Sequence, residues 1–372
     1  MSAQPELPII LHIDDEPDDL QAWRDAIDAK GEVRIEIRHP RDVTAHDLKA
    51  ACTVLVDVKL EHWSERQNLN SLALKPPNGL ALLAVLQEHA YELSKDMPRA
   101  FALYSGVVTE IARGLRPPEH IVARAHNLEW VFDKTAGDTE ARVEQVSALA
   151  SAVRALPNPW PGDSAETAGA ALGTWLALPE TATWAQAAWR SVLRCRPPMH
   201  EFAEHTHGIG VLRWMLHRVL PYPCFLLDDA HLAARLRVTL ASFRAQLDAA
   251  PTLRKLLEPA EYGGQLRTFI GRRWWRAGID TLAFDLAVED PANIELLQQE
   301  LKKGAPGLEL LPTDAFVVID ADYRIKNSLA RPDEVVEVIP DDWPPFADPA
   351  WALTADVEAA PDLRAIVADE ES

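Results

Sequence analysis

The sequence predicts an α/β protein: a doubly wound, five-stranded parallel sheet followed by a mainly helical region with a small β element. Short apolar segments alternate with helical segments throughout residues 1–156. Beyond residue 165, apolar residues recur mainly at helical spacing. The segment 157–164, PNPWPGDS, interrupts both patterns with three prolines and one glycine. We therefore expect a first domain at 1–156, a linker at 157–164 and a mainly α-helical second domain at 165–372.

Each element of the first domain follows from a local pattern. Apolar runs of strand length predict four strands, and alternation of apolar and polar residues predicts another, so that the expected strands are 8–13, 33–39, 53–58, 99–106 and 128–134. Helical spacing predicts the segments between and after them, at 17–30, 41–51, 79–93, 107–114 and 138–156. The last of these begins at Asp138, a good N-cap residue with acids in the following turn.

The second domain is predicted to be mainly helical. Apolar periodicity indicates helices at 166–178, 182–194, 208–220, 231–250, 265–287 and 294–303. Two strand-like segments, 315–328 and 334–340, predict a β-hairpin near 315–340, with Asp320 and Asp322 near its turn. The C-terminal end is rich in proline, tryptophan and acid, which favours a segment that wraps the surface or is partly flexible.

Charge and cysteine content narrow the function classes. The formal net charge is −20, which disfavours non-specific binding to nucleic acid or to an anionic membrane surface. No apolar run approaches the roughly 20 residues that a membrane helix requires, and the polar N-terminus does not resemble a signal peptide. The three cysteines are far apart and odd in number, which is typical of a protein in a reducing cytoplasm.

Polar residues follow the predicted strands of the first domain at the points where those strands end. They are Asp14 and Asp15, Asp57, Ser105 and Lys134. Because the carboxyl ends of parallel strands meet at one edge of a sheet, we expect these groups to converge. Two or three carboxylates suit Mg²⁺, and one carboxylate can then act as a nucleophile toward a phosphoryl group. A lysine and a hydroxyl would stabilise the phosphoryl oxygens.

Residues 8–156 resemble a response-regulator receiver domain of two-component signalling. The resemblance lies in ILHIDDEPDDL at the first strand, VLVDV at the third, LYSG at the fourth and FDK at the fifth. It implies a flavodoxin-like fold, phosphorylation of Asp57 by a sensor histidine kinase, and Mg²⁺ held by Asp14, Asp15 and Asp57. It further implies the backbone carbonyl of Lys59 as a metal ligand, and Ser105 and Lys134 as partners of the phosphoryl group.

The sequence departs from the family at three places. A long segment, EHWSERQNLNSLALKPPN at 61–78, separates the third strand from the next helix, and it either covers the site, docks a partner or is a surface insertion. The family's aromatic switch residue is Val131 here, flanked by Trp130 and Phe132, which should face the other side of the sheet. Thr135 follows the lysine in place of the family's usual proline.

Three hypotheses on function follow. The first is a response regulator whose second domain serves as output or docking module. The second is a phosphoryl sink, or buffer, without enzymatic output, of the kind found in two-component-like phage-defence systems. The third is a new enzyme in the second domain, switched by the first. All three predict a kinase partner and Mg²⁺, allow a separate effector protein and a homodimer, and include neither nucleic acid nor membrane as partner.

Three motifs of the second domain carry alternative interpretations. HEFAEHTHG contains His200, His205 and His207, but the first two are five residues apart, whereas a zinc-protease helix needs four. RRWWRAG at 272–278 either stacks on nucleotides or forms a buried tryptophan face. Asp228 or Asp229 in FLLDDAHL is most simply the N-cap of the following helix. No motif predicts a DNA-binding output.

Overall fold

The computed structural model describes residues 6–68, 75–94, 97–106, 108–111, 117–162, 164–199, 208–288, 290 and 293–368. The chain divides into two compact units. The first unit comprises residues 1–176, 198–217 and 268–270, and the second comprises 177–197, 218–267 and 271–372. The first unit therefore takes in two segments, 198–217 and 268–270, that lie far beyond the proline-rich linker in sequence.

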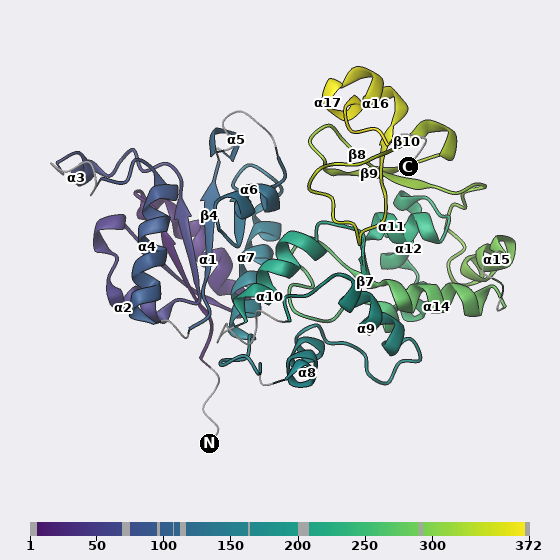
Figure 1. Cartoon of the computed structure of the whole chain (residues 1–372), viewed down its shortest axis with the longest axis horizontal. Coiled ribbons are helices and arrows are strands. Elements are labelled where there is room, and N and C mark those ends of the chain that lie inside the picture. Colours follow the sequence, from purple (N-terminus) through teal and green to yellow (C-terminus); the bar gives the residue numbers. More distant parts are fainter. Residues whose placement is uncertain are drawn as a thin grey trace. The chain divides into compact units, whose positions relative to one another are not determined.

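A five-stranded parallel sheet forms the centre of the first unit (Figure 1). Its strand order is β2-β1-β3-β4-β5, with every neighbouring pair parallel. The strands are β1 Ile9–Ile13, β2 Arg34–Arg38, β3 Thr53–Asp57, β4 Ala100–Ser105 and β5 Trp130–Asp133. The predicted α/β class and all five predicted strands are confirmed.

Helices connect the strands and cover both faces of the sheet. The helical segments of this unit are η1 Pro17–Leu20, α1 Gln21–Lys30, η2 Pro40–Asp42, α2 Ala45–Ala50, α3 Ser64–Gln67, α4 Gly79–Leu93, α5 Val108–Ile111, α6 Glu119–Ala125, α7 Thr139–Arg154, α8 Ala165–Trp175 and α10 Ile209–Trp214. Asp138 caps α7 as predicted, since its carboxylate accepts the Ala141 amide. Helix α6 was not predicted, and much of the predicted helix 107–114 lies outside the described residues.

The two faces of the sheet bury different residues. Helices α2 and α4 lie side by side, as do α1 and α7 (Figure 1). Side chains alternate along a strand, so Leu11 and Ile13 of β1 join the core cluster that contains Leu83 of α4. His12, between them, contacts Tyr104 of β4 instead, with ring centroids 5.2 Å apart. The face of the sheet opposite α4 therefore buries polar and aromatic side chains, His12 and Tyr104, near the carboxyl end of β1.

Two segments from much later in the chain, 208–217 and 268–270, pack against the edge strand β5. Glu129, immediately before β5, is fully buried, and its Oε1 accepts a hydrogen bond from Arg213 Nε at 2.6 Å. His217 Nε2 bonds the backbone carbonyl of Glu129 at 2.9 Å. The ring of Phe269 lies edge-on to Trp130, 4.9 Å between centroids. An ion pair, a hydrogen bond and an aromatic contact therefore tie the later segments to this strand.

The second unit is mainly helical. Its helical segments are α9 Ala185–Arg194, α11 Asp229–Arg235, α12 Leu240–Ala249, α13 Pro251–Leu257, η6 Glu258–Ala260, α14 Arg276–Leu286, α15 Ile294–Gly304, η7 Pro332–Glu334, α16 Thr354–Ala359 and α17 Pro361–Arg364, while the π-helical turn η5 Met215–Val219 spans the division between the units. The strands β6 Leu226–Leu227 and β7 Trp274–Trp275 pair antiparallel. A four-stranded sheet has the order β10-β11-β8-β9.

Three predicted elements of the second unit are wrong in extent. The helix expected at 265–287 begins only at Arg276, because Trp274 and Trp275 are buried and pair with β6. The helix expected at 231–250 is two helices, separated where Arg237 adopts a positive φ of 52°.

The predicted strand 315–328 is a hairpin of two strands, β8 Phe316–Ile319 and β9 Ile325–Ala330. The Asp320 carboxylate accepts the amides of Asp322 and Arg324 at 2.9 and 3.0 Å, which turns the chain between them. β10 Val335–Val338 pairs with β11 Ala350–Leu353, a strand that was not predicted, rather than with β9. The hairpin within 315–340 is therefore shorter than predicted, and the sheet has more strands.

Candidate metal centre

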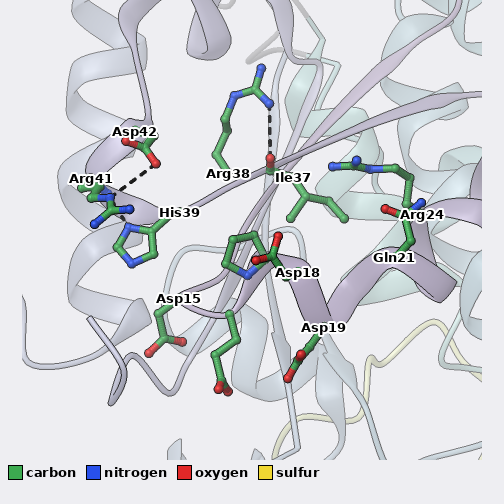
Figure 2. A pocket seen from close by; sticks show the side chains of 12 residues that line it. Asp15, Asp18, Asp19, Gln21, Arg24, Ile37, Arg38, His39, Arg41 and Asp42 are labelled. Atoms are coloured by element: carbon green, nitrogen blue, oxygen red, sulfur yellow. Dashed lines mark hydrogen bonds and ion pairs between the residues drawn. The ribbon is translucent and has the colours of Figure 1, made fainter. Parts of the chain in front are cut away.

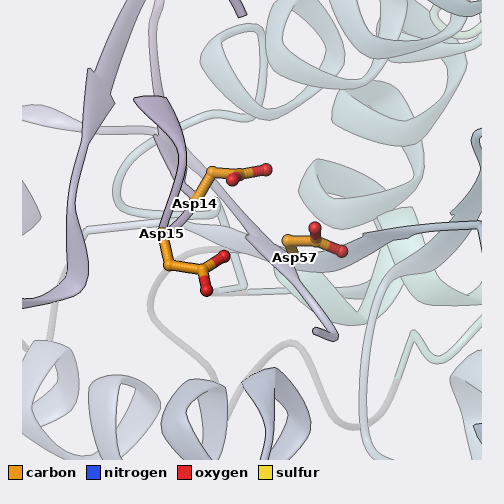
Figure 3. Close-up of side chains that lie close together, drawn as sticks. All are labelled: Asp14, Asp15 and Asp57. Carbon is orange, nitrogen blue, oxygen red and sulfur yellow. The ribbon is translucent and has the colours of Figure 1, made fainter. Parts of the chain in front are cut away.

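Three carboxylates converge at the carboxyl edge of the parallel sheet (Figure 3). Asp14 and Asp15 directly follow β1, and Asp57 is the last residue of β3, the neighbouring strand. One oxygen from each of the three lies within 4.8 Å of the other two. Asp14 and Asp15 are buried, and Asp57 is partly buried. The parallel pairing of β1 with β3 brings these acids together, as the sequence predicted.

Lys134, the residue after β5, supplies the positive charge of this cluster. Its Nζ donates to Asp57 Oδ2 at 2.9 Å and lies 3.5 Å from Asp14 Oδ2. Burial alone would lower the pKa of Lys134, but the hydrogen bond and charge of Asp57, together with Asp14, raise it. The ammonium therefore stays charged at neutral pH and offsets part of the repulsion among the acids.

Asp57 has an unusual environment for a carboxylate. Burial raises the pKa of Asp57 above its ordinary value, and the charge of Asp14 adds to this, although the hydrogen bond from Lys134 opposes both. A cation among the three carboxylates would favour the ionised form. The donor set fits a hard divalent ion such as Mg²⁺, because all three side chains offer oxygen and each acid can supply one ligand. The three acids can therefore hold a metal ion.

The other two predicted site residues lie at the same edge. Ser105 ends β4 and is buried, and its backbone carbonyl accepts the amide of Lys134 at 2.8 Å. Lys59 lies two residues beyond Asp57 and has an exposed side chain. Lys134 therefore contacts Asp57 and Asp14 through its side chain and Ser105 through its backbone amide.

The long segment after Asp57 contacts the acidic cluster. The His62 amide donates to Asp15 Oδ2 at 2.6 Å, and its ring Nδ1 lies 3.0 Å from Glu16 Oε2. Residues 69–74 of this segment lie outside the described residues. At its far end, a Cβ placed on Gly79 would approach the Asp57 carbonyl oxygen to 1.7 Å. Glycine is therefore required where α4 begins, because only its bare Cα fits against the end of β3.

Sequence reasoning missed three residues that surround Lys134. The Lys134 ammonium lies 5.1 Å from the centre of the Tyr104 ring, within cation–π range. Arg142 of α7 donates to the backbone carbonyl of Lys134 at 2.7 Å. Tyr104 lies on a different strand from Lys134, and Arg142, although only eight residues from Lys134, lies in a helix beyond a turn, so no motif of the sequence predicts either contact.

His12 is the third missed residue. It is fully buried, and neither ring nitrogen has a hydrogen-bond partner in the described part of the chain. Burial lowers the pKa of His12 to about 4, with a further lowering by Lys134 and an opposing effect of Asp14. The ring is therefore neutral at physiological pH and adds no charge beneath the cluster. The only sequence signal was a histidine inside an otherwise apolar strand.

A cavity of about 700 Å³ lies beside Asp15, at the carboxyl ends of β1 and β2 (Figure 2). Its wall mixes acids, among them Asp18 and Asp19, with the basic side chains of Arg24 and Arg41. Because Asp15 is part of its wall, the cavity reaches the acidic cluster from the side of β2.

The predicted motifs of the second unit have different outcomes. His200, His205 and His207 lie outside the described residues, so the zinc hypothesis stays a prediction. Trp274 and Trp275 are each 1% exposed, so neither indole of RRWWRAG presents a face to a base. Asp228 caps α11 as predicted, accepting the His231 amide at 2.8 Å.

The comparisons with known proteins add no family to this description. The chain matches no protein-family model, and no curated protein matches it. Among the helices of the described ranges, none combines the length and apolar character needed to cross a bilayer.

Proposed function

We propose that the first unit is a receiver domain that accepts a phosphoryl group on Asp57 from a histidine kinase. One observation carries the proposal: Asp57 shares an edge with Asp14 and Asp15, and its Oδ2 receives Lys134 Nζ at 2.9 Å. Buried neighbouring carboxylates are costly unless a cation is bound among them. A nucleophilic carboxylate with a metal site on one side and an ammonium on the other is suited to phosphoryl transfer.

In the proposed reaction, a carboxylate oxygen of Asp57 attacks the phosphorus atom of a phosphohistidine in line. The P–N bond breaks, its electron pair leaves with the imidazole, and an acyl phosphate forms on Asp57. Asp14 and Asp15 would hold Mg²⁺, which would neutralise charge on the phosphoryl oxygens. Lys134 moves its hydrogen bond from the carboxylate to a phosphoryl oxygen, and the Ser105 hydroxyl donates to another.

The test is labelling of the intact chain with a small phosphodonor in the presence of Mg²⁺. The expected result is a gain of one phosphoryl mass that requires Mg²⁺ and disappears in Asp57→Asn. Asp18→Asn is a matched control, because this exposed acid lines the neighbouring cavity without belonging to the three-carboxylate cluster. Persistent labelling of Asp57→Asn, or no labelling by small donors and by a cognate kinase, would refute the assignment.

A phosphoryl sink is the second candidate, and the surroundings of Val131 favour it. Val131 lies in the hydrophobic core, while Trp130 and Phe132 contact Phe269 of the same unit. Position 131 therefore has no aromatic side chain that could change its orientation when Asp57 is phosphorylated and so transmit the signal. Hydrogen exchange distinguishes the candidates: a sink leaves the exchange rates of the second unit unchanged on phosphorylation, whereas a regulator changes them.

A further inference from the structure

A pocket of about 460 Å³ lies entirely within the second unit. Its wall comes from α11, from β8, which lies beside α11 (Figure 1), and from the chain entering β11. The residues that decide its chemistry are His231, Arg235, Arg237, Phe316, Asp348 and Trp351. The volume is in the range of small-molecule sites, and the mixture of aromatic surface with a few polar groups is typical of them.

Asp228 holds the His231 ring in one orientation. Its Nδ1 lies 2.9 Å from Asp228 Oδ1, which also accepts the His231 backbone amide. Although burial opposes it, His231 and Arg273 hold the pKa of Asp228 well below its usual range. An ionised carboxylate only accepts hydrogen bonds, so Nδ1 of His231 carries a proton in this contact. Nε2 has no partner among the described residues, and in the tautomer with its proton on Nδ1 it is the acceptor that His231 offers to a ligand.

Two aromatic rings form another part of the wall. Phe316 begins β8, and Trp351 lies in β11, the parallel neighbour of β8. Their ring centroids are 4.5 Å apart, at an interplanar angle of 57°. Both side chains are only partly buried, so part of their ring surface is accessible. A planar ligand gains most from such a surface, because flat rings stack without losing internal freedom.

The charged groups of the pocket are largely paired. Arg276 binds Asp348 through two nitrogens, at 2.6 and 2.5 Å, and Arg237 pairs with Asp314. Arg235 donates to Asp280 through Nε at 2.6 Å, and its two terminal nitrogens make no bond within the described ranges. The pocket thus offers donors from Arg235 without a strong net charge. Its lining contains no serine, threonine or cysteine, which favours binding over covalent catalysis.

We propose that this pocket binds a nucleobase-bearing small molecule, a nucleoside or a nucleotide. The base stacks on Trp351 with Phe316 against its edge, a ring N–H or amino group donates to His231 Nε2, and Arg235 donates to an acceptor oxygen of the ligand. A nucleobase combines a flat ring with donors and acceptors on its edge, as these three features require. This site goes beyond the proposed phosphoacceptor function and does not depend on it.

The test is isothermal titration of the intact chain with adenosine, guanosine, cytidine, uridine and their 5′-monophosphates. The expected result is saturable binding of one base type with a Kd at or below about 1 mM. His231→Ala should weaken it roughly 3- to 10-fold, the effect of one lost hydrogen bond. Trp351→Leu should weaken it at least about 5-fold, while Trp351→Phe retains most of the affinity.

Two controls keep the outcome interpretable. Phe284→Ala removes an exposed aromatic side chain of the same unit outside the pocket and should leave binding unchanged. Arg235→Gln shows which part of the ligand Arg235 contacts. If only the monophosphate loses affinity, Arg235 contacts the phosphate; if the nucleoside loses affinity equally, Arg235 contacts the base. Absence of saturable binding by all eight probes would overturn the proposal. So would binding that is unaffected in both His231→Ala and Trp351→Leu.

Discussion

Replacing Arg213 by methionine tests the contact between β5 and the segment 208–217. The Glu129 side chain is 0% exposed, and its carboxylate receives Arg213 Nε at 2.6 Å and the Phe101 amide. Breaking a buried ion pair costs about 3–5 kcal/mol because the remaining charge stays buried. The Arg213 side chain is 35% exposed, so solvent screening places the loss at the lower end, about 3 kcal/mol. For a unit of this size the apparent Tm falls by roughly 6–12 °C.

The loss in Arg213→Met should depend on pH. Burial raises the pKa of Glu129, and Arg213 opposes the rise. Without Arg213 the folded-state pKa is higher still, so the folded unit binds this proton more tightly than the unfolded chain does. The extra loss of stability is therefore fully present above the folded-state pKa of the variant, and it shrinks as the pH falls from there to the lower, but still raised, folded-state pKa of the native protein. Denaturant unfolding should show a larger difference from the native protein at about pH 8 than at about pH 5.

Two further variants make this experiment decisive. Lys303→Met removes an exposed i,i+3 ion pair with Glu300 and should cost no more than about 0.5 kcal/mol. Glu129→Gln, added to Arg213→Met, removes the stranded charge and should recover part of the stability. Equal losses in Arg213→Met and Lys303→Met, or a loss that does not vary with pH, would refute the reasoning.

Three other predictions concern the acidic cluster. Gly79→Ala should lower the free energy of unfolding by about 2–3 kcal/mol, because the new methyl group meets the Asp57 carbonyl. Denaturant unfolding measures this loss. In the control Gly263→Ala the new methyl group enters open space, and the free energy of unfolding should change by no more than about 0.5 kcal/mol. Mg²⁺ affinity by titration should fall as the pH drops through the raised pKa of Asp57, because protons compete with the ion, and Asp57→Asn should flatten this dependence. Arg142→Gln should slow phosphorylation about tenfold by releasing the Lys134 backbone, with Mg²⁺ affinity unchanged; an unchanged rate would contradict that positioning role.

The strands of the first unit were predictable because burial and chain direction determine them locally. An apolar run that ends in acids, such as the one before Asp14, has few alternatives to a buried strand ending at a polar edge. Parallel pairing alone then places Asp57 and Lys134 at the same edge as Asp14. This part of the site therefore follows from local pattern and a general rule of sheet topology.

The errors arise where distant contacts override local spacing. The segment before Arg276 has helical periodicity, yet Trp274 and Trp275 pair with β6 and are buried there. The 231–250 pattern continues across a break at Arg237, where Val238 forms a bridge with Leu310. Contacts of Glu129 could not be predicted for the same reason, since its partner lies 84 residues further along the chain.

The packing of β5 also has a consequence for biosynthesis. A ribosome that has just made Glu129 must add 140 more residues before Phe269 exists, the difference between the two positions. At ordinary elongation rates this takes roughly 7–28 s. For the first 84 of these residues the nascent sheet lacks the arginine for its buried carboxylate, and throughout the interval it lacks the ring that packs on Trp130. The first unit therefore completes its folding only after most of the chain has been translated. Until then the edge strand β5 stays exposed, and chaperones that bind exposed strands would limit its aggregation.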